Sequence, residues 1–393
     1  MSGGERTGRD ERMNAAGDAR ATELRTAHIR DVTLDAADIW PDYKPTRLVE
    51  LPALARGERV GRVFVKLECE RPLGNFKAIG GMVAGLRALA RVAGVSRLRD
   101  LRSAERGFAE PRDAARGHHE LQSRARELPA LVCASAGNHG LAVAAAARWA
   151  GTEATVYLAE NANRARAARI EALGARVVWT PGTYDDAVER ASNSEGLVIA
   201  DTSGNPEDLV VRDVMEGYQL IARELAAQLK CHPTHLFVQA GVGGLAAALT
   251  EGLRPLMQAP QRVLVVEPRA AACVAEALVA GHPVHINGPL STSAEMLACG
   301  LASAPAVRIL HEHDASSVLV EDDLLQQAAT RLRDANGPST TPSGATGLAG
   351  LLQVSSRERL RDLHQLNEES TVLLVVTEGP APSTSTIFGT SYT

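Results

Sequence analysis

The feature that most constrains the fold is an alternation of short apolar runs with longer helical patterns, which begins at Arg62. The predicted strands are residues 63–65, 130–134, 154–158, 176–180, 235–240, 262–267 and 372–376. The predicted helices are residues 82–92, 141–150, 162–173 and one that begins near Tyr184. Because successive strand–helix units place their strands side by side and parallel, this order predicts an α/β fold.

Composition excludes several classes of protein. A chain of 393 residues with 45% hydrophobic content can bury a large core and suits two domains better than one. The net charge of −5 is spread along the chain, so we expect no nucleic-acid partner. No apolar run reaches the roughly 18 residues of a membrane helix, and the polar start lacks the centre of a signal peptide, so we expect no membrane partner and a cytoplasmic location.

The five cysteines are isolated, and none forms a Cys-x-x-Cys pair, so neither a metal site nor a disulfide scaffold is expected. Residues 1–28 have little periodic apolar content and are predicted to be a mobile leader. Residues 97–127 are charged and helical in composition, as in an insertion, and residues 386–393 form a tail.

The first motif with chemical meaning is Gly74–Gly81, which places Lys77 among small and apolar residues just before a helix. Burial and a nearby helix N-terminus both disfavour an ammonium, so this position favours an amine that can react with a carbonyl. A surface lysine in a glycine-rich turn is the alternative interpretation.

The second motif, Ala134–Gly140, joins a predicted strand to an alanine-rich helix. Such a turn directs backbone N–H groups and a helix dipole at an anion, which suits a carboxylate or a phosphate. Asn138 can offer its amide to an oxygen on a ring, and His139 is interpreted as a structural or positioning residue.

The third motif, Gln239–Leu245, has three glycines in four positions between a strand and a helix, which indicates a phosphate cup. Tight packing of the connection is the alternative reason for the glycines. The motif lacks the spacing of a dinucleotide site and the Lys-Ser/Thr ending of a nucleotide loop, so neither NAD nor ATP is favoured.

The order of these motifs, followed by Thr377-Glu378-Gly379, resembles the fold type II, or tryptophan-synthase-β-like, family of pyridoxal-phosphate enzymes over roughly residues 35–385. Within that family the sequence is most similar to diaminopropionate ammonia-lyase. The segments behind this likeness are Tyr184-Asp185-Asp186, Asp201-Thr202, residues 239–243, residues 297–300 and residues 376–379.

The resemblance implies a homodimer whose subunits have two parallel-sheet α/β domains with the active site between them. The large domain would comprise residues 29–82 and 186–385, and the small domain residues 83–185. Lys77 would bind pyridoxal phosphate as an aldimine, Asn138 would bond the 3′-oxygen of its ring, and Thr377, or less favourably Ser343, would face the ring nitrogen. The phosphate would be held by Gly241, Val242, Gly243, Gly244 and Leu245.

The resemblance also implies a lyase reaction, the α,β-elimination of a small β-substituted L-amino acid such as L-2,3-diaminopropionate. Lys77 would remove the α-proton, and the aminoacrylate would hydrolyse to pyruvate and ammonia. Asp201 would lie near the substrate β-amino group. The alternative role for Asp201 is to cap a helix or a loop. The substrate carboxylate would bind at Ser135, Ala136, Gly137, Asn138 and His139.

Other reactions share this chemistry. A threonine or serine dehydratase and a β-replacement synthase stay open as alternatives, whereas a catalytically silent protein is disfavoured because Lys77, Asn138 and Thr377 are all retained. Ala136 stands where the resembling ammonia-lyases carry an acidic residue, so we expect a preference for L-substrates. Cys273 and Cys299 match two cysteines that can pair in some of these enzymes, and reduced thiols in proximity are expected here.

Overall fold

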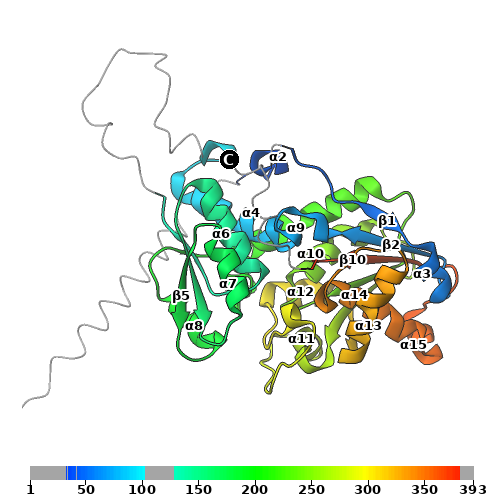
Figure 1. Ribbon diagram of the computed structural model, residues 1–393. Helices are drawn as coiled ribbons and strands as arrows, with labels where there is room; N and C mark the ends of the chain where they lie inside the picture. The colour runs from blue at the N-terminus through cyan, green and yellow to red at the C-terminus, as the bar shows by residue number, and fades with distance from the viewer. Residues whose placement is uncertain (1–31, 33, 41, 102–127, 381–393) are drawn as a thin grey trace, which may run out of the picture.

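The computed structural model describes residues 32, 34–40, 42–101 and 128–380 (Figure 1). Three predicted segments lie outside these residues: the leader at 1–28, the tail at 386–393 and the greater part of the insertion at 97–127. Among the described residues, none of the helices combines the length and the apolar composition that a membrane span requires.

Two sheets organise the chain. The strands are β1 (Leu48–Glu50), β2 (Arg62–Leu67), β3 (Leu131–Cys133), β4 (Ala154–Ala159), β5 (Arg176–Thr180), β6 (Leu197–Val198), β7 (His235–Gln239), β8 (Arg262–Pro268), β9 (Ser316–Val320) and β10 (Thr371–Val376). The larger sheet has the order β1-β2-β10-β7-β8-β9, and the smaller has the order β5-β4-β3-β6. All neighbouring pairs are parallel except β1 and β2, which confirms the predicted α/β fold with two parallel sheets.

Helices cover the sheets and connect them. Those described are α2 (Ala36–Ile39), α3 (Pro52–Gly57), α4 (Lys77–Ala93), α6 (Asn138–Ala150), α7 (Arg164–Glu171), α8 (Tyr184–Ser192), α9 (Leu209–Gln228), α10 (Gly244–Leu253), α11 (Cys273–Ala280), α12 (Ala304–Glu312), α13 (Asp322–Asp334), α14 (Pro342–Ser355) and α15 (Glu358–His364). Short 3₁₀ turns lie at Glu68–Glu70, Pro72–Gly74, Arg254–Leu256, Arg269–Ala271 and Glu295–Leu297.

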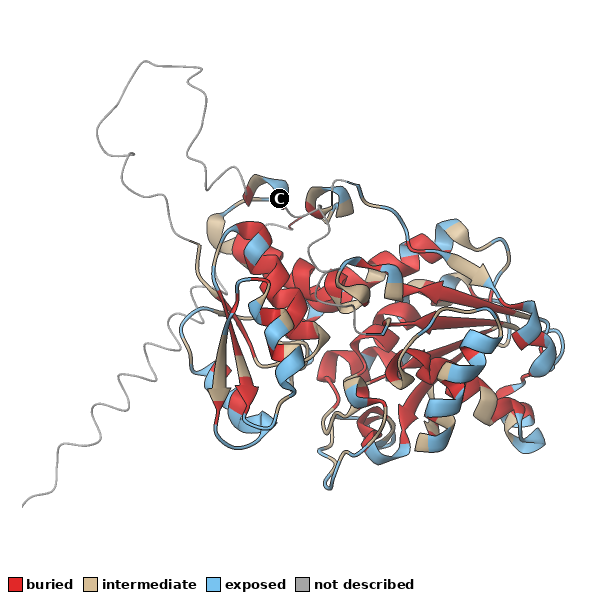
Figure 2. Cartoon of the chain, viewed as in Figure 1, coloured by how far each residue is buried: buried red, intermediate tan, exposed pale blue. Residues whose placement is uncertain are grey.

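Side chains of the larger sheet alternate between two apolar cores, as the two-residue period of a strand requires. In β10, Leu373 and Val375 belong to a core that also contains residues of α4, α6, α9 and α10. Val372, Leu374 and Val376 point into a second core with residues of α13 and α14. The first core extends into the smaller sheet, and Figure 2 shows the buried helices between the two sheets. The two sheets are therefore joined by packed helices.

Helix α4 begins at Lys77, so its predicted start at Met82 is wrong. Glycine lowers helix propensity, and Gly80 and Gly81 make the first turn look unfavourable in the sequence. Packing explains the glycines, because a Cβ on Gly80 would lie 2.2 Å from Tyr218 Cε1 and one on Gly81 would lie 2.6 Å from Ala142 Cβ. Tertiary contact with α9 and α6 thus outweighs local propensity at this end of α4.

The smaller sheet continues past the predicted boundary at residue 185. That boundary falls inside α8, and β6, which pairs with β3, comes later in the chain. The residues up to Val198 therefore belong with the smaller sheet, while the division of the chain into two domains stays a prediction.

Candidate active site

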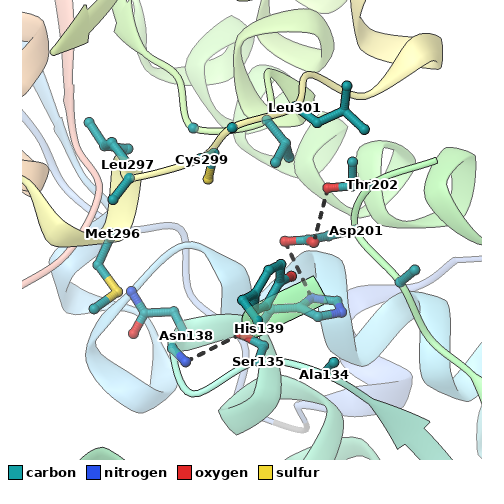
Figure 3. A pocket seen from close by; sticks show the side chains of 18 of the residues that line it. Ala134, Ser135, Asn138, His139, Asp201, Thr202, Met296, Leu297, Cys299 and Leu301 are labelled. Atoms are coloured by element: carbon teal, nitrogen blue, oxygen red, sulfur yellow. Dashed lines mark hydrogen bonds and ion pairs between the residues drawn. The ribbon is translucent and has the colours of Figure 1, made fainter. Parts of the chain in front are cut away.

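The loops that follow β2, β3, β6, β7 and β10 meet around a cavity of about 820 Å³. Each of these loops leaves the carboxyl end of a parallel strand, the edge at which open α/β sheets bind ligands. In Figure 3, Asp201 and Thr202 lie on one side of the cavity, and Asn138 and Met296 lie on the other. All the site residues predicted from the sequence line this cavity.

Lys77 is held in the cavity by the segment that follows β10. The N–H of Phe76 donates to the carbonyl of Thr377 at 3.0 Å, and the N–H of Gly379 donates to Gly74 O at 3.0 Å. These two bonds fix the start of α4 beside Thr377, although the two segments are far apart in sequence.

The other lysines of the chain are Lys44, Lys66 and Lys230. Lys44 and Lys230 are exposed on the surface, and Lys66 is fully buried in an ion pair with Glu224. Lys77 is thus the lysine whose amine reaches the cavity.

Lys77 Nζ donates a hydrogen bond to Asp201 Oδ2. Burial is the largest influence on the pKa of Lys77 and lowers it, but the charge and the hydrogen bond of Asp201, together with Tyr218 and Cys299, raise the pKa above its ordinary value. Burial likewise opposes the charge of Asp201, yet the Lys77 ammonium holds the pKa of that carboxyl well below its usual range. The sequence-based expectation of a neutral amine is therefore wrong for Lys77 beside Asp201, because the sequence does not reveal that these two residues are neighbours.

His139 is buried beneath this ion pair. Its Nε2 lies 2.8 Å from Ile199 O, and its Nδ1 lies 4.0 Å from Asp201 Oδ2. Burial lowers the pKa of His139, so the ring is neutral and donates through Nε2. His139 thereby ties α6 to the loop that presents Asp201, which suits a positioning role.

The turn from Ser135 to Asn138 lines the cavity and leads into the N-terminus of α6. Helix α6 begins at Asn138, so its first N–H groups have no partner within the helix. Ser135 Oγ accepts a hydrogen bond from the N–H of Gly137 at 3.2 Å, and a Cβ on Gly140 would lie 2.1 Å from Ser135 O. This tight turn at a helix N-terminus is suited to bind a carboxylate.

The predicted phosphate cup, Gly241–Leu245, ends at the N-terminus of α10, whose first N–H groups point at the cavity. Gly243 has a φ of 96°, a conformation that favours glycine. A Cβ on Gly241 would lie 3.1 Å from Cys299 Sγ and would narrow the cup. No carboxylate occurs from Gly241 to Leu245, so the cup fits a phosphate.

Thr377 directly follows β10 and is 3% exposed. Its Oγ1 accepts a hydrogen bond from Gln239 Nε2 at 2.9 Å. Ser343, the second candidate for the ring nitrogen, accepts a hydrogen bond at Oγ from the N–H of Met296 at 3.1 Å. Both hydroxyls line the cavity and can donate to a heterocyclic nitrogen.

Glu378 and Gln239 are site residues to which the sequence pattern gave no role. Glu378 accepts hydrogen bonds from Asn138 Nδ2 and from Thr341 Oγ1, so it orients the amide of Asn138. The signal for both was a polar side chain placed directly at the end of an apolar strand, next to a motif residue.

Asp186 caps its own helix. The N-cap Thr183 and Asp186 form a capping box at the start of α8, while Asp185 lies exposed at the rim of the cavity. Cys273 and Cys299 are both free thiols on either side of Gly241, and Cys273 Sγ donates to Gly241 O at 3.2 Å. Burial raises the pKa of the Cys299 thiol to about 11, so it remains protonated.

A reactive lysine, a phosphate cup and a buried hydroxyl around one cavity define a site that fits a phosphorylated aldehyde with a ring nitrogen. Pyridoxal phosphate has these three groups. Comparison with known proteins agrees, since the family model described as pyridoxal-phosphate dependent enzyme matches residues 39–378.

Relatives and solved structures narrow this class. A diaminopropionate ammonia-lyase of Salmonella typhimurium is 31% identical, with 94% of this chain and 93% of the relative covered. A probable D-serine dehydratase of an Acidovorax species is 28% identical, with 74% of this chain and 66% of the relative covered. The crystal structure of diaminopropionate ammonia lyase from Escherichia coli in complex with D-serine matches with a TM-score of 0.74 at 26% identity, and covers 92% of this chain and 89% of that one.

The chain belongs to the family of pyridoxal-phosphate-dependent enzymes, and within it to that of diaminopropionate ammonia-lyase. The predicted family, cofactor and lyase class are thereby confirmed.

Proposed function

We propose that this enzyme catalyses the α,β-elimination of a small β-substituted L-amino acid, with L-2,3-diaminopropionate as its substrate, to give pyruvate and ammonia. The observation that supports this most strongly is the Lys77–Asp201 pair, because it places an amine and a carboxylate together in the cavity. The relatives named diaminopropionate ammonia-lyase support the same choice of substrate.

The cofactor would be held by Lys77 at its aldehyde, by Gly241–Leu245 at its phosphate, by Asn138 at its 3′-oxygen and by Thr377 at its ring nitrogen. When bound, pyridoxal phosphate withdraws electrons from the substrate Cα and makes the Cα–H bond acidic. Every other part of the reaction then depends on how the protein binds the substrate and moves protons.

Lys77 is the base in this proposal. Burial lowers the pKa of its amine, and Asp201 is the strongest of the groups that counter that effect. When a substrate ammonium occupies Asp201 instead, Lys77 is left as a buried amine that can accept the Cα proton. The first N–H groups of α6 would hold the substrate carboxylate and so orient the Cα–H bond toward Lys77.

Asp201 would bind the β-ammonium of the substrate. An ionised carboxylate in a buried site attracts a cation strongly, and it keeps the leaving nitrogen protonated so that it departs as ammonia. A hydroxyl leaving group gains less from this arrangement, because it needs a proton donor rather than a carboxylate.

A serine or threonine dehydratase is the second candidate function. Ala136 supports it through the resemblance, because threonine-dehydratase-like enzymes have a similar small residue at this position. Relatives named probable D-serine dehydratase also support this candidate.

The test is a substrate panel assayed for keto acid and ammonia. L- and D-diaminopropionate, L-serine, L-threonine and β-chloro-L-alanine would be incubated with the loaded enzyme. We expect pyruvate from L-diaminopropionate with both substrate nitrogens released as ammonia. Keto acid from L-serine or L-threonine but not from L-diaminopropionate would establish the dehydratase. Consumption of substrate only after a thiol or amine is added, with a new amino acid as the product, would establish β-replacement.

Three further expectations belong to this proposal. The homodimer and the two-domain division rest on the resemblance, and the pairing of β6 with β3 moves the end of the smaller unit from the expected residue 185 to about Val198. The cytoplasmic location rests on the apolar pattern of the sequence. Size-exclusion chromatography with light scattering would test the oligomeric state directly.

A further inference from the structure

We infer that Gln239 is a positioning residue that turns the hydroxyl hydrogen of Thr377 into the cavity and so keeps the ring nitrogen of the bound cofactor unprotonated. The placement of Thr377 at that nitrogen comes from the proposed function, on which this step rests. The new element is Gln239, which acts through Thr377 rather than on the cofactor.

Gln239 is the last residue of β7, immediately before the glycine cup, and is 3% exposed. Its Nε2 is surrounded by oxygen acceptors. They are Thr377 Oγ1 at 2.9 Å, Gly344 O at 3.0 Å, Val375 O at 3.1 Å and Ser343 O at 3.3 Å. Three of these four acceptors are backbone carbonyls, which never donate.

The carbonyls determine which way the amide of Gln239 is turned. The oxygen and nitrogen of an amide are assigned from the hydrogen-bond network, and here the reversed orientation would set Oε1 against three carbonyl oxygens with no hydrogen between them. Gln239 Oε1 has no donor among the described residues. The present orientation still forms more hydrogen bonds than the reversed one, in which neither the oxygen nor the nitrogen of the amide would meet these carbonyls favourably. The nitrogen of the amide therefore faces Thr377.

The direction of the Thr377 hydroxyl follows from that of the amide. A threonine hydroxyl has one hydrogen, and an oxygen that accepts from Gln239 must direct this hydrogen elsewhere. No carbonyl or carboxylate in the part of the chain that the structure describes accepts it, and Thr377 lines the cavity. The hydroxyl is thus a fixed donor toward the ligand.

A fixed donor determines the charge of the ring that it faces. A pyridine nitrogen that accepts a hydrogen bond uses its lone pair for that bond, which favours its neutral form and lowers its pKa. A neutral ring withdraws electrons less strongly, and this favours prompt loss of the β-substituent over transamination. Gln239 would therefore help to set which reaction the enzyme carries out.

The test uses enzyme loaded with cofactor labelled with ¹⁵N in the ring and follows that nitrogen by NMR without substrate. We expect the wild-type nitrogen to have the chemical shift of a neutral pyridine from pH 6 to 9. Gln239→Met, which keeps the size but removes the donor, should move the shift toward the protonated position. With substrate, the variant should form pyridoxamine phosphate about tenfold more often per turnover, the effect of a single pKa unit.

A double-mutant cycle separates positioning from structure. In a Thr377→Val background, Gln239→Met should leave the ¹⁵N shift unchanged, whereas a purely structural role would alter loading and thermal stability in both backgrounds. Gln327→Met makes the same substitution at an exposed position of α13, so it is the matched control and should leave the shift as in wild type.

Equal ¹⁵N shifts in wild type and Gln239→Met, or a protonated wild-type nitrogen, would overturn the inference. The protonated wild-type nitrogen would overturn it even if Gln239→Met fails to fold. Because no turnover is needed for the NMR readout, absence of pyruvate from diaminopropionate would refute the proposed substrate and leave the result for Gln239 intact.

Discussion

The ion pair between Lys77 and Asp201 gives each residue a protonation state that neither would have alone. Burial opposes the charge on both side chains, and their contact reverses that opposition. The pair therefore places a carboxylate that can bind a cation next to an amine that can act as a base. A substrate ammonium that displaced Lys77 from Asp201 would be bound by Asp201 and would leave Lys77 free to accept a proton.

Asp201→Asn tests this coupling. We expect diaminopropionate turnover to fall by about a hundredfold to ten-thousandfold, the range typical of a lost acid–base or charge partner. β-Chloro-L-alanine should lose much less, because chloride departs without a proton. Steady-state rates with both substrates measure the difference, and Asp185→Asn at the exposed rim is the matched control. Equal losses with both substrates would contradict the assigned role.

Ala136→Asp tests the stereochemical expectation. The wild-type turn has no base at this position, so we expect little activity on D-diaminopropionate. The variant should gain about a hundredfold or more, within the range that one acid–base group supplies. Ala136→Asn has the same size without the base and should stay at the wild-type level. Comparable turnover of both enantiomers by the wild type would show that Ala136 does not limit specificity.

At the same scale, the sequence predicted the residues of the site better than their interactions. Lys77, Asn138 and Thr377 could be picked out because each lies in a short motif, and all three line the cavity. The roles of Gln239 and Glu378 were not, because both depend on partners from distant segments. The same reason explains the wrong expectation for the protonation state of Lys77.

Among the elements, α4 is the one on which the site most depends, since it starts with Lys77 and packs on both α6 and α9. Gly80 allows this packing, because a Cβ there would lie 2.2 Å from Cε1 of the buried Tyr218. We expect Gly80→Ala to lower the free energy of unfolding by about 1–3 kcal/mol through overpacking. Urea denaturation measures the change.

The matched control for that variant is Gly204→Ala. Gly204 is exposed, and a Cβ on it would have no neighbour within 4 Å. It should change the free energy of unfolding by less than about 0.5 kcal/mol, as surface substitutions usually do. If both variants behaved alike, close packing of α4 against α9 would not be what holds Lys77 in position.

Strands and helices with a clear pattern of apolar residues could be predicted from the sequence, and the others could not. The strands β4, β5 and β8 match their predicted spans to within a residue, because each is an apolar run of strand length. The two-residue strand β6 and the edge strand β1 are too short for a pattern, and their pairing is decided by the neighbouring strand. Helix starts at Lys77 and Asn138 were placed too late because glycine and polar residues occupy the first turns.

For the whole molecule, stability should depend on pH through buried histidine. His235 is fully buried in β7, and burial lowers its pKa from 6.5 to about 4. Between these values the unfolded chain binds a proton on His235 and the folded chain does not, so acidification favours unfolding. We expect a loss of up to roughly 3 kcal/mol as the pH falls from 6.5 to 4.

Denaturation at several pH values measures this effect. His235→Gln keeps an N–H for His364 O but cannot titrate, so its stability should fall less steeply on acidification. His282→Gln, at an exposed position, should keep the wild-type slope. Parallel slopes for wild type and His235→Gln would mean that other groups cause the acid sensitivity.

The placement of Lys77 in the cavity is tested most directly by trapping the cofactor on the protein. The loaded enzyme would be reduced with borohydride, digested and analysed by mass spectrometry for the lysine with the pyridoxyl group. We expect the label on Lys77 and its loss in Lys77→Arg, which keeps a charge beside Asp201 but has no reactive amine. A label on Lys44, Lys66 or Lys230, or a bound cofactor that borohydride does not attach to any lysine, would contradict the assigned site.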